Sequence, residues 1–545
     1  MISTGRESLM TLGWQLGVIV AIALSFIVVW HLSRPNGRWS SAIRSRYIHG
    51  VPWGSLISIS GVLLFYLIVQ RGLWYWYDPV TVAFTASSYY NPLGVITAGI
   101  AHSSPGHLTN NLTAALVLAP LAEYVYGHYP PDDRRSRFTV VTNPYVRAFV
   151  IFPAAVLTAA LFTGLFAWGP VIGFSGVVFA FAGFTLVKFP IVTILALLAR
   201  SAMRTIIQSV TDPVVIAQAA PTFSRPSWAG IAVQGHALGL LLGVIAGAYI
   251  MWRRQERPDP LRLWVGSVLA GMSLSLWAFW WTRGTDVYVL YRGLGVVAVL
   301  ILSLLITIAL VVDDRPWWGD LTYRQTAVLL LFIPLLTMSL VAIPLNLNTV
   351  TVQGPENGIE VGDYYVFYDR DVHDEMIGVI DISLFGETTS VTTNGVIVAS
   401  DDRNVWRREV SSSRLGFSGS ETVVVGGLTW RDTIEATRNG WNPVGADRVY
   451  MIWFEYDGDR SLAYATSMQQ VEPVIDGRQI YIGPHEGEFI LEVYSSDSVS
   501  WTTVPVTNES VTLEGITIVN DDDRLFAKTD DGTSVRIAAI EHYNS

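Results

Sequence analysis

Three short polar motifs interrupt the apolar segments of this chain, and their residue types could catalyse acyl transfer. Segment 173–181 reads GFSGVVFAF and contains Ser175, segment 102–111 reads HSSPGHLTNN, and segment 235–243 reads GHALGLLLG and contains His236. A serine hydroxyl becomes a nucleophile when a neutral imidazole within hydrogen-bonding distance accepts its proton. The oxyanion that develops then needs fixed hydrogen-bond donors. Strongly polar groups at membrane depth are costly and by default indicate function.

The elements that position these motifs are predicted to be membrane-spanning helices. About 20 apolar residues are enough to cross a bilayer core. Such runs recur up to residue 346, and the fifth and sixth are separated only at Lys188–Pro190. The ten predicted spans are 11–31, 52–70, 107–127, 148–168, 173–188, 190–207, 230–251, 262–282, 292–312 and 326–346.

Arginines in the short loops predict the orientation of these spans. The loops 32–51, 128–147 and 252–261 fall on one side if there are ten spans, so this side is predicted to be cytoplasmic. Both termini and the region after residue 346 are then outside. The arginines of these loops are Arg34, Arg38, Arg44, Arg46, Arg134, Arg135, Arg137, Arg147, Arg253, Arg254 and Arg257.

The predicted topology brings the polar residues to one depth. Ser175 lies 13 residues before Lys188, and His236 lies 17 residues before Arg253. At about 1.5 Å per residue, both lie roughly 20–25 Å above the cytoplasmic edge. The third span also runs inward. Near its start it carries a histidine and an asparagine, spaced i and i+4, so that both lie on one helix face at the depth of Ser175 and His236. Those residues are His107 and Asn111.

Small residues indicate how the serine and the histidine could meet. Gly239 and Gly243 follow His236 at i+3 and i+7 and form a smooth strip on which another helix can pack closely. Gly176 and Gly183 could supply the facing surface. Each motif alone is weak, since a serine in a membrane helix is more often a packing residue. No carboxylate lies near His236 in the sequence, so the arrangement would be a dyad and not a triad.

These motifs make the segment from about 52 to 251 similar to the rhomboid intramembrane serine proteases. The resemblance rests on four motifs in the order that the family shows, spread over six spans. They are H-x4-H-x3-N at His102, His107 and Asn111, a glutamate twelve residues later at Glu123, G-x-S-G at Gly173, Ser175 and Gly176, and H-x2-G-x3-G at His236, Gly239 and Gly243. The six-helix core of the family would then correspond to spans two to seven.

The resemblance implies a role for each matching residue. Ser175 would be the nucleophile, His236 the general base, and Asn111, His107 and the Ser175 N–H the oxyanion site. His102 would support the outer loop, and Glu123 would be a structural hydrogen-bonding residue. The loop 208–229, with Trp228, would be a mobile cap, and the glycines would permit close packing. One departure is that residues 74–77, WYWY, lack the Trp-Arg pair that the family often carries.

Charge divides the chain at the end of the last span. Residues 1–346 carry 22 Lys+Arg against 12 Asp+Glu, and residues 347–545 carry 13 against 33, which together give the net charge of −10. An acidic, lysine-poor surface resembles that of proteins from salt-loving microbes, so a halophilic archaeon is the expected source. Mean hydropathy is +0.39, above that of ordinary soluble proteins. The chain has no cysteine, which excludes disulfides, thiolate metal sites and a cysteine nucleophile.

After residue 346 the hydrophobic pattern changes to period two. Segments such as RVYMIWFEY and GEFILEVYSS alternate apolar and polar residues between turn-forming clusters. This pattern predicts an antiparallel β-sandwich, or two small ones. Asp521–Asp523 and the group His485, Glu486 and Glu488 could bind a cation, but a solvated acidic face is the favoured interpretation. We expect a binding, spacing or substrate-presenting module.

The leading hypothesis is a multi-pass cell-membrane endopeptidase that uses a Ser-His dyad to cleave transmembrane proteins near the outer side. It predicts a lipid bilayer and a transmembrane protein substrate as partners, a protein partner for the C-terminal module, and no nucleic acid, cofactor or metal ion. A non-catalytic receptor or scaffold with the same fold is the alternative, and a transporter is third. The predicted domains are an extra N-terminal helix and loop (1–51), the protease core (52–251), three further membrane helices (252–346) and the acidic β module (347–545).

Overall fold

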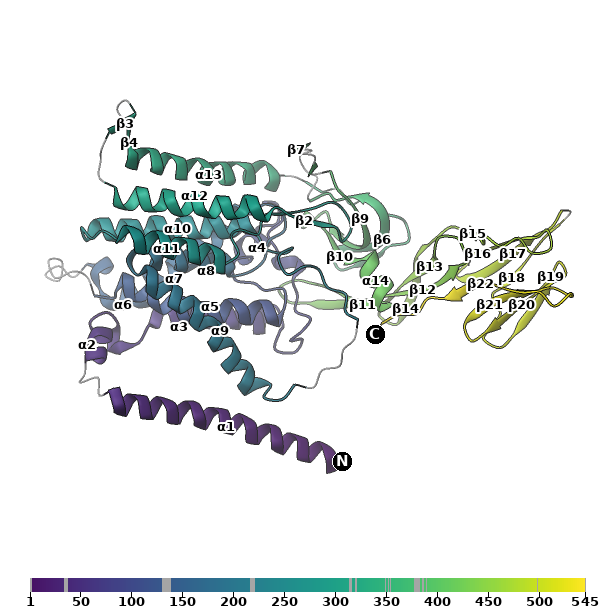
Figure 1. The fold of residues 1–545 in the computed structure, drawn as a ribbon, viewed down its shortest axis with the longest axis horizontal. Coiled ribbons are helices and arrows are strands. Elements are labelled where there is room, and N and C mark those ends of the chain that lie inside the picture. Colours follow the sequence, from purple (N-terminus) through teal and green to yellow (C-terminus); the bar gives the residue numbers. More distant parts are fainter. Residues whose placement is uncertain are drawn as a thin grey trace.

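The computed structural model of this protein is an elongated molecule with a helical bundle at one end and a β region at the other (Figure 1). Arg34, Arg134, Arg135 and Arg137 of the predicted basic loops lie outside the described residues, as does part of the loop 208–229. The structure describes residues 2–544 except 34–37, 130–138, 216–220, 313–315, 319–320, 348, 351, 353, 377–382, 385–386, 389 and 497.

Helices cover most of each predicted span except the eighth, and three short helices, α2, α4 and α6, lie in segments predicted as loops. Proline occupies the first turn of α4, α5, α9 and α11, where the missing N–H costs no helical hydrogen bond. The helices are α1 (Ile2–Ser33), α2 (Arg38–Arg44), α3 (Trp53–Leu64, continued by a wider turn to Val69), α4 (Pro92–Thr97), α5 (Pro105–Tyr126), α6 (Pro144–Val146), α7 (Phe152–Leu165), α8 (Ser175–Lys188), α9 (Pro190–Thr211), α10 (Val233–Arg253), α11 (Pro260–Ser273), α12 (Arg292–Val311) and α13 (Tyr323–Asn346).

Among the described residues, six helical segments are long and apolar enough to cross a membrane. They are Thr11–Val29, Pro144–Leu165, Pro190–Thr211, Val233–Arg253, Arg292–Val311 and Tyr323–Asn346. Two shorter apolar helices, Trp53–Val69 and Ser175–Lys188, also coincide with predicted spans. The other two predicted spans, at α5 and α11, do not meet this criterion. The helical membrane region is therefore confirmed, whereas the total of ten crossings stays a prediction.

The predicted eighth span, 262–282, is wrong over its second half. Helix α11 ends at Ser273, and the chain then forms a hairpin of β1 (Trp280–Thr282) and β2 (Tyr288–Leu290). The segment reads as apolar because of Trp277, Phe279 and the tryptophans of β1. Such aromatic residues are enriched at membrane interfaces as well as in spans, so their hydropathy does not by itself predict a helix.

Helices α8 and α10 pack with their backbones in direct contact, and glycine allows it. A Cβ atom on Gly239 would lie 2.1 Å from the Gly176 carbonyl oxygen, and one on Gly243 would lie 2.0 Å from that of Ala180. From the other side, a Cβ atom on Gly183 would lie 2.2 Å from the Leu240 carbonyl oxygen. The two helix backbones therefore touch along the strip of small residues that the sequence predicts.

The C-terminal β region consists of two units, each with its own hydrophobic core. In the first unit, α14 (Ser412–Ser418) and a sheet in the order β10-β9-β6-β5 pack on β11 to β14. The second unit packs the sheet β15-β16-β17-β18 on β19 to β22. The long strand β12 belongs to both units, because it pairs with β11 and β13 and, at its end, with β22. The prediction of a β-rich C-terminal region is confirmed.

The strands of these units are β5 (Ile359–Val361), β6 (Tyr364–His373), β9 (Thr392–Ser400), β10 (Val405–Ser411), β11 (Ser420–Gly426), β12 (Arg431–Pro443), β13 (Val449–Tyr456), β14 (Asp459–Ala465), β15 (Gln469–Gln470), β16 (Gln479–His485), β17 (Glu488–Tyr494), β18 (Val499–Thr503), β19 (Ser510–Leu513), β20 (Ile516–Asp521), β21 (Arg524–Lys528) and β22 (Ser534–Ile540). Short hairpins β3–β4 (Pro316–Trp318, Leu321–Thr322) and β7–β8 (Ser383–Leu384, Glu387–Thr388) lie outside them. Asp521–Asp523 form the tight turn between β20 and β21.

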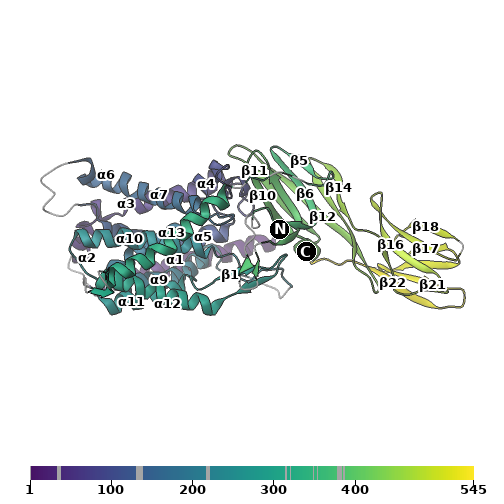
Figure 2. The ribbon, with the colours of Figure 1, turned by 90° about the horizontal axis from the view of Figure 1, so that it is seen from above.

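The first β unit rests on the loops at one end of the helical bundle (Figure 2). Val82, from the loop between α3 and α4, is part of the hydrophobic core of this unit. The Arg431 guanidinium lies over the Tyr75 ring, 3.9 Å from its centroid, and Arg407 Nη1 donates to Thr85 Oγ1 at 3.1 Å. The two regions are therefore joined by packed contacts as well as by the chain itself.

Candidate active site

Ser175 and His236 lie in direct contact across the glycine-lined seam of α8 and α10. The distance between Ser175 Oγ and His236 Nε2 is 2.8 Å, and both residues are half-buried. Ser175 is the first residue of α8, so its backbone N–H has no acceptor within the helix and lies at the positive end of the helix dipole. The hydroxyl, a proton acceptor and a free N–H donor are thus gathered at one point.

The His236 ring is oriented by stacking. The Phe179 ring lies parallel to it, with the two centroids 4.1 Å apart and the planes 14° from each other. Among the described residues, no group accepts a hydrogen bond from His236 Nδ1. Among the residues that the structure describes, no carboxylate is therefore bonded to this imidazole. Phe179 was not predicted from the sequence, although its position, i+4 from Ser175 on α8, places it on the same helix face.

His107 and Asn111 lie against Gly173, two residues before Ser175, and the glycine makes room for them. Gly173 has a φ of +135°, and a Cβ atom there would lie 2.5 Å from His107 Cε1 and 3.6 Å from Asn111 Nδ2. A larger residue is therefore excluded by both conformation and space. His107 Nδ1 lies 3.1 Å from Ser103 Oγ.

His102 is buried behind this group and links it to the loop between α3 and α4. Its Nε2 lies 3.1 Å from Asn111 Nδ2, and its ring meets the His107 ring edge to face. The side chain of Gln70 donates to the His102 carbonyl oxygen and accepts from the His102 N–H, both at 2.8 Å. Gln70 also donates to the Val80 carbonyl oxygen, which fixes the loop to the site. The sequence motifs did not reveal Gln70.

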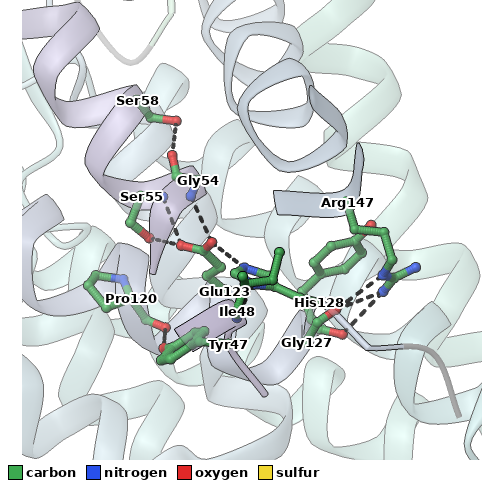
Figure 3. A network of polar contacts seen from close by, with 11 residues as sticks. Tyr47, Ile48, Gly54, Ser55, Ser58, Pro120, Glu123, Gly127, His128 and Arg147 are labelled. Atoms are coloured by element: carbon green, nitrogen blue, oxygen red, sulfur yellow. Dashed lines mark hydrogen bonds and ion pairs between the residues drawn. The ribbon is translucent and has the colours of Figure 1, made fainter. Parts of the chain in front are cut away.

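Glu123 lies in a separate, fully buried network toward the opposite end of α5 (Figure 3). Its carboxylate accepts hydrogen bonds from the N–H groups of Gly54 and Ser55, both at 2.8 Å, and from the Ser55 hydroxyl at 2.6 Å. His128 Nδ1 accepts from the Ile48 N–H, so its proton is on Nε2, which donates to Glu123 at 2.5 Å. This carboxylate thus joins α3, α5 and the segment before α3.

Glu123→Gln is expected to lower the free energy of unfolding by about 3 kcal/mol, because an amide nitrogen cannot accept from these N–H groups. The measurement is denaturant unfolding in detergent micelles, followed by tryptophan fluorescence. Glu256→Gln is the matched control, since its ion pair with Lys188 is more exposed and contributes no more than about 1 kcal/mol. Equal effects of the two substitutions would contradict a structural role for Glu123.

The loop 208–229 reaches the β region through aromatic contact. The Phe223 ring lies 6.0 Å, centroid to centroid, from the Phe417 ring of α14. Trp228 lies in the last turn of the loop before α10. No group of three or more His, Cys, Asp or Glu side chains that could hold a metal ion is found in the part of the chain that the structure describes.

Comparison with known proteins identifies one segment of the chain. Residues 90–253 match the family model of the Rhomboid domain. This match begins within the expected region of 52–251 and covers α4 to α10, including all four motifs, whereas α3 lies outside it. No curated protein and no solved structure matches the chain.

Proposed function

Because residues 90–253 form a rhomboid domain, and members of that family are usually intramembrane serine proteases, we propose that this protein is an intramembrane serine endopeptidase. The observation that carries the proposal is the 2.8 Å contact between Ser175 Oγ and His236 Nε2. It supports a hydrolytic function over the alternative of a non-catalytic scaffold, which has no need of this contact.

In the proposed reaction, His236 Nε2 accepts the Ser175 proton while Oγ attacks the carbonyl carbon of the scissile peptide bond. The tetrahedral intermediate collapses when His236 returns this proton to the leaving amine. Water, activated by the same imidazole, then attacks the acyl-enzyme and releases Ser175. Stacking on Phe179 keeps the imidazole in line with Oγ throughout.

The oxyanion of each intermediate is proposed to bind the Ser175 N–H, the Asn111 amide and the His107 ring. An amide nitrogen carries two N–H groups, so Asn111 can donate one to His102 and still offer the other to the oxyanion. Gly173 lets both side chains approach this point. Fixed donors at a developing charge are commonly the largest contribution to catalysis of this kind.

The proposed substrate is a transmembrane protein that is cleaved near the outer side of the membrane. The basic residues of the loops support a cytoplasmic location for the end of the bundle at Arg147 and Arg254. The β region is then extracytoplasmic, on the same side as the dyad, where it can bind or present a substrate or partner protein. The proposed protease core is 52–251, flanked by an extra helix in 1–51, three further helices in 252–346 and the acidic module 347–545.

A fluorophosphonate probe tests the proposal directly, because it reacts only with an activated serine. The detergent-solubilised wild-type protein is expected to be labelled at Ser175, and Ser175→Ala is expected to remain unlabelled. Mass spectrometry of the modified peptide identifies the site. If the folded wild-type protein is not labelled, the scaffold alternative is favoured.

A further inference from the structure

Two arginines lie in the middle of a membrane helix, close to the proposed active site. Arg200 and Arg204 are four residues apart on α9, so they lie on the same helix face. Of the arginines that the structure describes in the bundle, the others lie in loops or near helix ends. A charged side chain at this depth is costly and is retained where it meets a partner or a ligand.

The Arg200 side chain reaches to the level of the dyad. Its Nη2 donates a hydrogen bond to Asn110 Oδ1 on α5 at 2.5 Å. Asn110 directly precedes Asn111, whose amide belongs to the proposed oxyanion site. One residue step on a helix turns the side chain by about 100°, so Asn110 faces α9 while Asn111 faces α8. The guanidinium therefore lies on the face of α5 next to the one that carries Asn111.

Neither guanidinium has an acidic partner among the residues that the structure describes. Lys188, by contrast, forms an ion pair with Glu256 in the same bundle. Among the described residues, no ion pair involves Arg200 or Arg204, and an asparagine oxygen is the hydrogen-bond partner of Arg200. Two uncompensated positive charges in a low-dielectric setting attract an anion.

The second half of α9, which carries these arginines, is little buried, although α1 also packs against this helix. The buried residues of α9 are Pro190, Thr193 and Leu197, all in its first half. Toward its C-terminal end, α9 runs away from α5 at an angle, as Figure 1 shows. Arg204 is exposed and Arg200 is half-buried. A chain that enters between the outer parts of α5 and α9 would pass both guanidinium groups before it reaches Ser175.

We propose that Arg200 and Arg204 form a specificity subsite that binds an acidic side chain of the substrate within a few residues of the scissile bond. This inference rests on the proposed protease function and adds a substrate preference to it. A substrate carboxylate is favoured over a lipid phosphate because Asn110 holds the Arg200 guanidinium against α5, beside the residue that binds the scissile carbonyl. Arginine can bind such a carboxylate with two parallel hydrogen bonds.

The test uses a transmembrane reporter with alanines flanking the cleavage site, in which each flanking position is changed in turn to Asp, Asn or Lys. The full-length protein is reconstituted in phosphatidylcholine vesicles, so that no anionic lipid competes. At one position, the Asp reporter is expected to be cleaved with a kcat/KM about tenfold higher than the Asn reporter. Arg204→Glu is expected to invert this preference, so that Lys is favoured over Asp. Arg200→Lys is expected to keep it and Arg200→Gln to reduce it.

Arg324→Glu is the matched control, because Arg324 is an exposed arginine in the first turn of another membrane helix, α13. It should leave the Asp-to-Asn ratio unchanged. An Asp-to-Asn ratio of kcat/KM equal to one at every position of the wild-type reporter series would overturn the subsite. An Arg204→Glu variant that cleaves all reporters more slowly by the same factor would also overturn it. A preference that appears only when phosphatidylglycerol is added would also overturn it and would assign the arginines to lipid.

A binding measurement separates this inference from the proposed function. The Ser175→Ala variant and fluorescent Asp and Asn reporters are mixed in the same vesicles, and their affinities are compared by energy transfer. Tighter binding of the Asp reporter supports the subsite even if the wild-type protein cleaves nothing. Equal binding of the two reporters, together with normal cleavage, overturns the subsite alone.

Discussion

Alanine at position 175 is expected to abolish cleavage of a transmembrane reporter, with a loss in kcat of at least about a thousandfold. The reason is that no other described hydroxyl is bonded to the His236 ring, so no other group can replace the nucleophile. His236→Ala is expected to cause a similar loss, because Oγ then has no proton acceptor. The measurement is initial rates in proteoliposomes, with the folded state of each variant verified by its melting temperature.

The double variant sharpens this prediction. Groups that act as one catalytic unit have non-additive effects, so Ser175→Ala/His236→Ala should be no slower than either single variant. Ser339→Ala is the control, because the Ser339 hydroxyl bonds only to a carbonyl oxygen of its own helix, α13. Cleavage that survives either single substitution would refute the dyad.

Gly239→Ala is expected to prevent stable folding of the bundle or to separate the dyad. The added Cβ atom would lie 2.1 Å from the Gly176 carbonyl oxygen, so α8 and α10 must move apart. A clash with backbone cannot be relieved by a side-chain rotation, and we expect a loss of about 3 kcal/mol or more in unfolding free energy. Chemical denaturation in micelles and fluorophosphonate labelling measure the two consequences.

The matched control for this change lies on the same helix. A Cβ atom on Gly235 would have no heavy atom within 4 Å, and alanine is a better helix former than glycine. Gly235→Ala should therefore be neutral or stabilising. If Gly235→Ala and Gly239→Ala have equal effects, the close approach of the two helices is not what holds Ser175 against His236.

The residues at the centre of the site could be placed from sequence because helix geometry is regular. The fixed rise per residue puts Ser175 and His236 at one depth, and the glycines at i+3 and i+7 indicate which helix faces meet. The structure has both residues in contact, and it places His107 and Asn111 against the neighbouring Gly173. Their catalytic roles stay a proposal that the experiments above test.

Other features depend on contacts that no sequence period encodes. Gln70 and His128 lie in loops or at helix ends, where the spacing of residues in the sequence does not determine the direction of their side chains. Arg200 and Arg204 do not stand out in a hydropathy average, since two charges still leave a 22-residue helix apolar. The tryptophan-rich hairpin after α11 has the reverse problem, because its aromatic residues raise hydropathy without forming a helix. The sequence pattern also does not show that β12 belongs to two hydrophobic cores, because this depends on which strands pair with it in the folded protein.

Because Val82 belongs to the hydrophobic core of the first β unit, cutting the chain after Asn346 would not be a clean deletion. Val80 contacts the same unit, with its Cγ2 close to Gly426. A truncated protein would leave both valines of this loop without their partners, and the loop is the one that Gln70 ties to His102. A loss of activity in the truncated protein would then result from the displacement of this loop beside the proposed active site, even if the β region never touched a substrate. Point substitutions on the outward faces of the β region are therefore the sound way to assess its role.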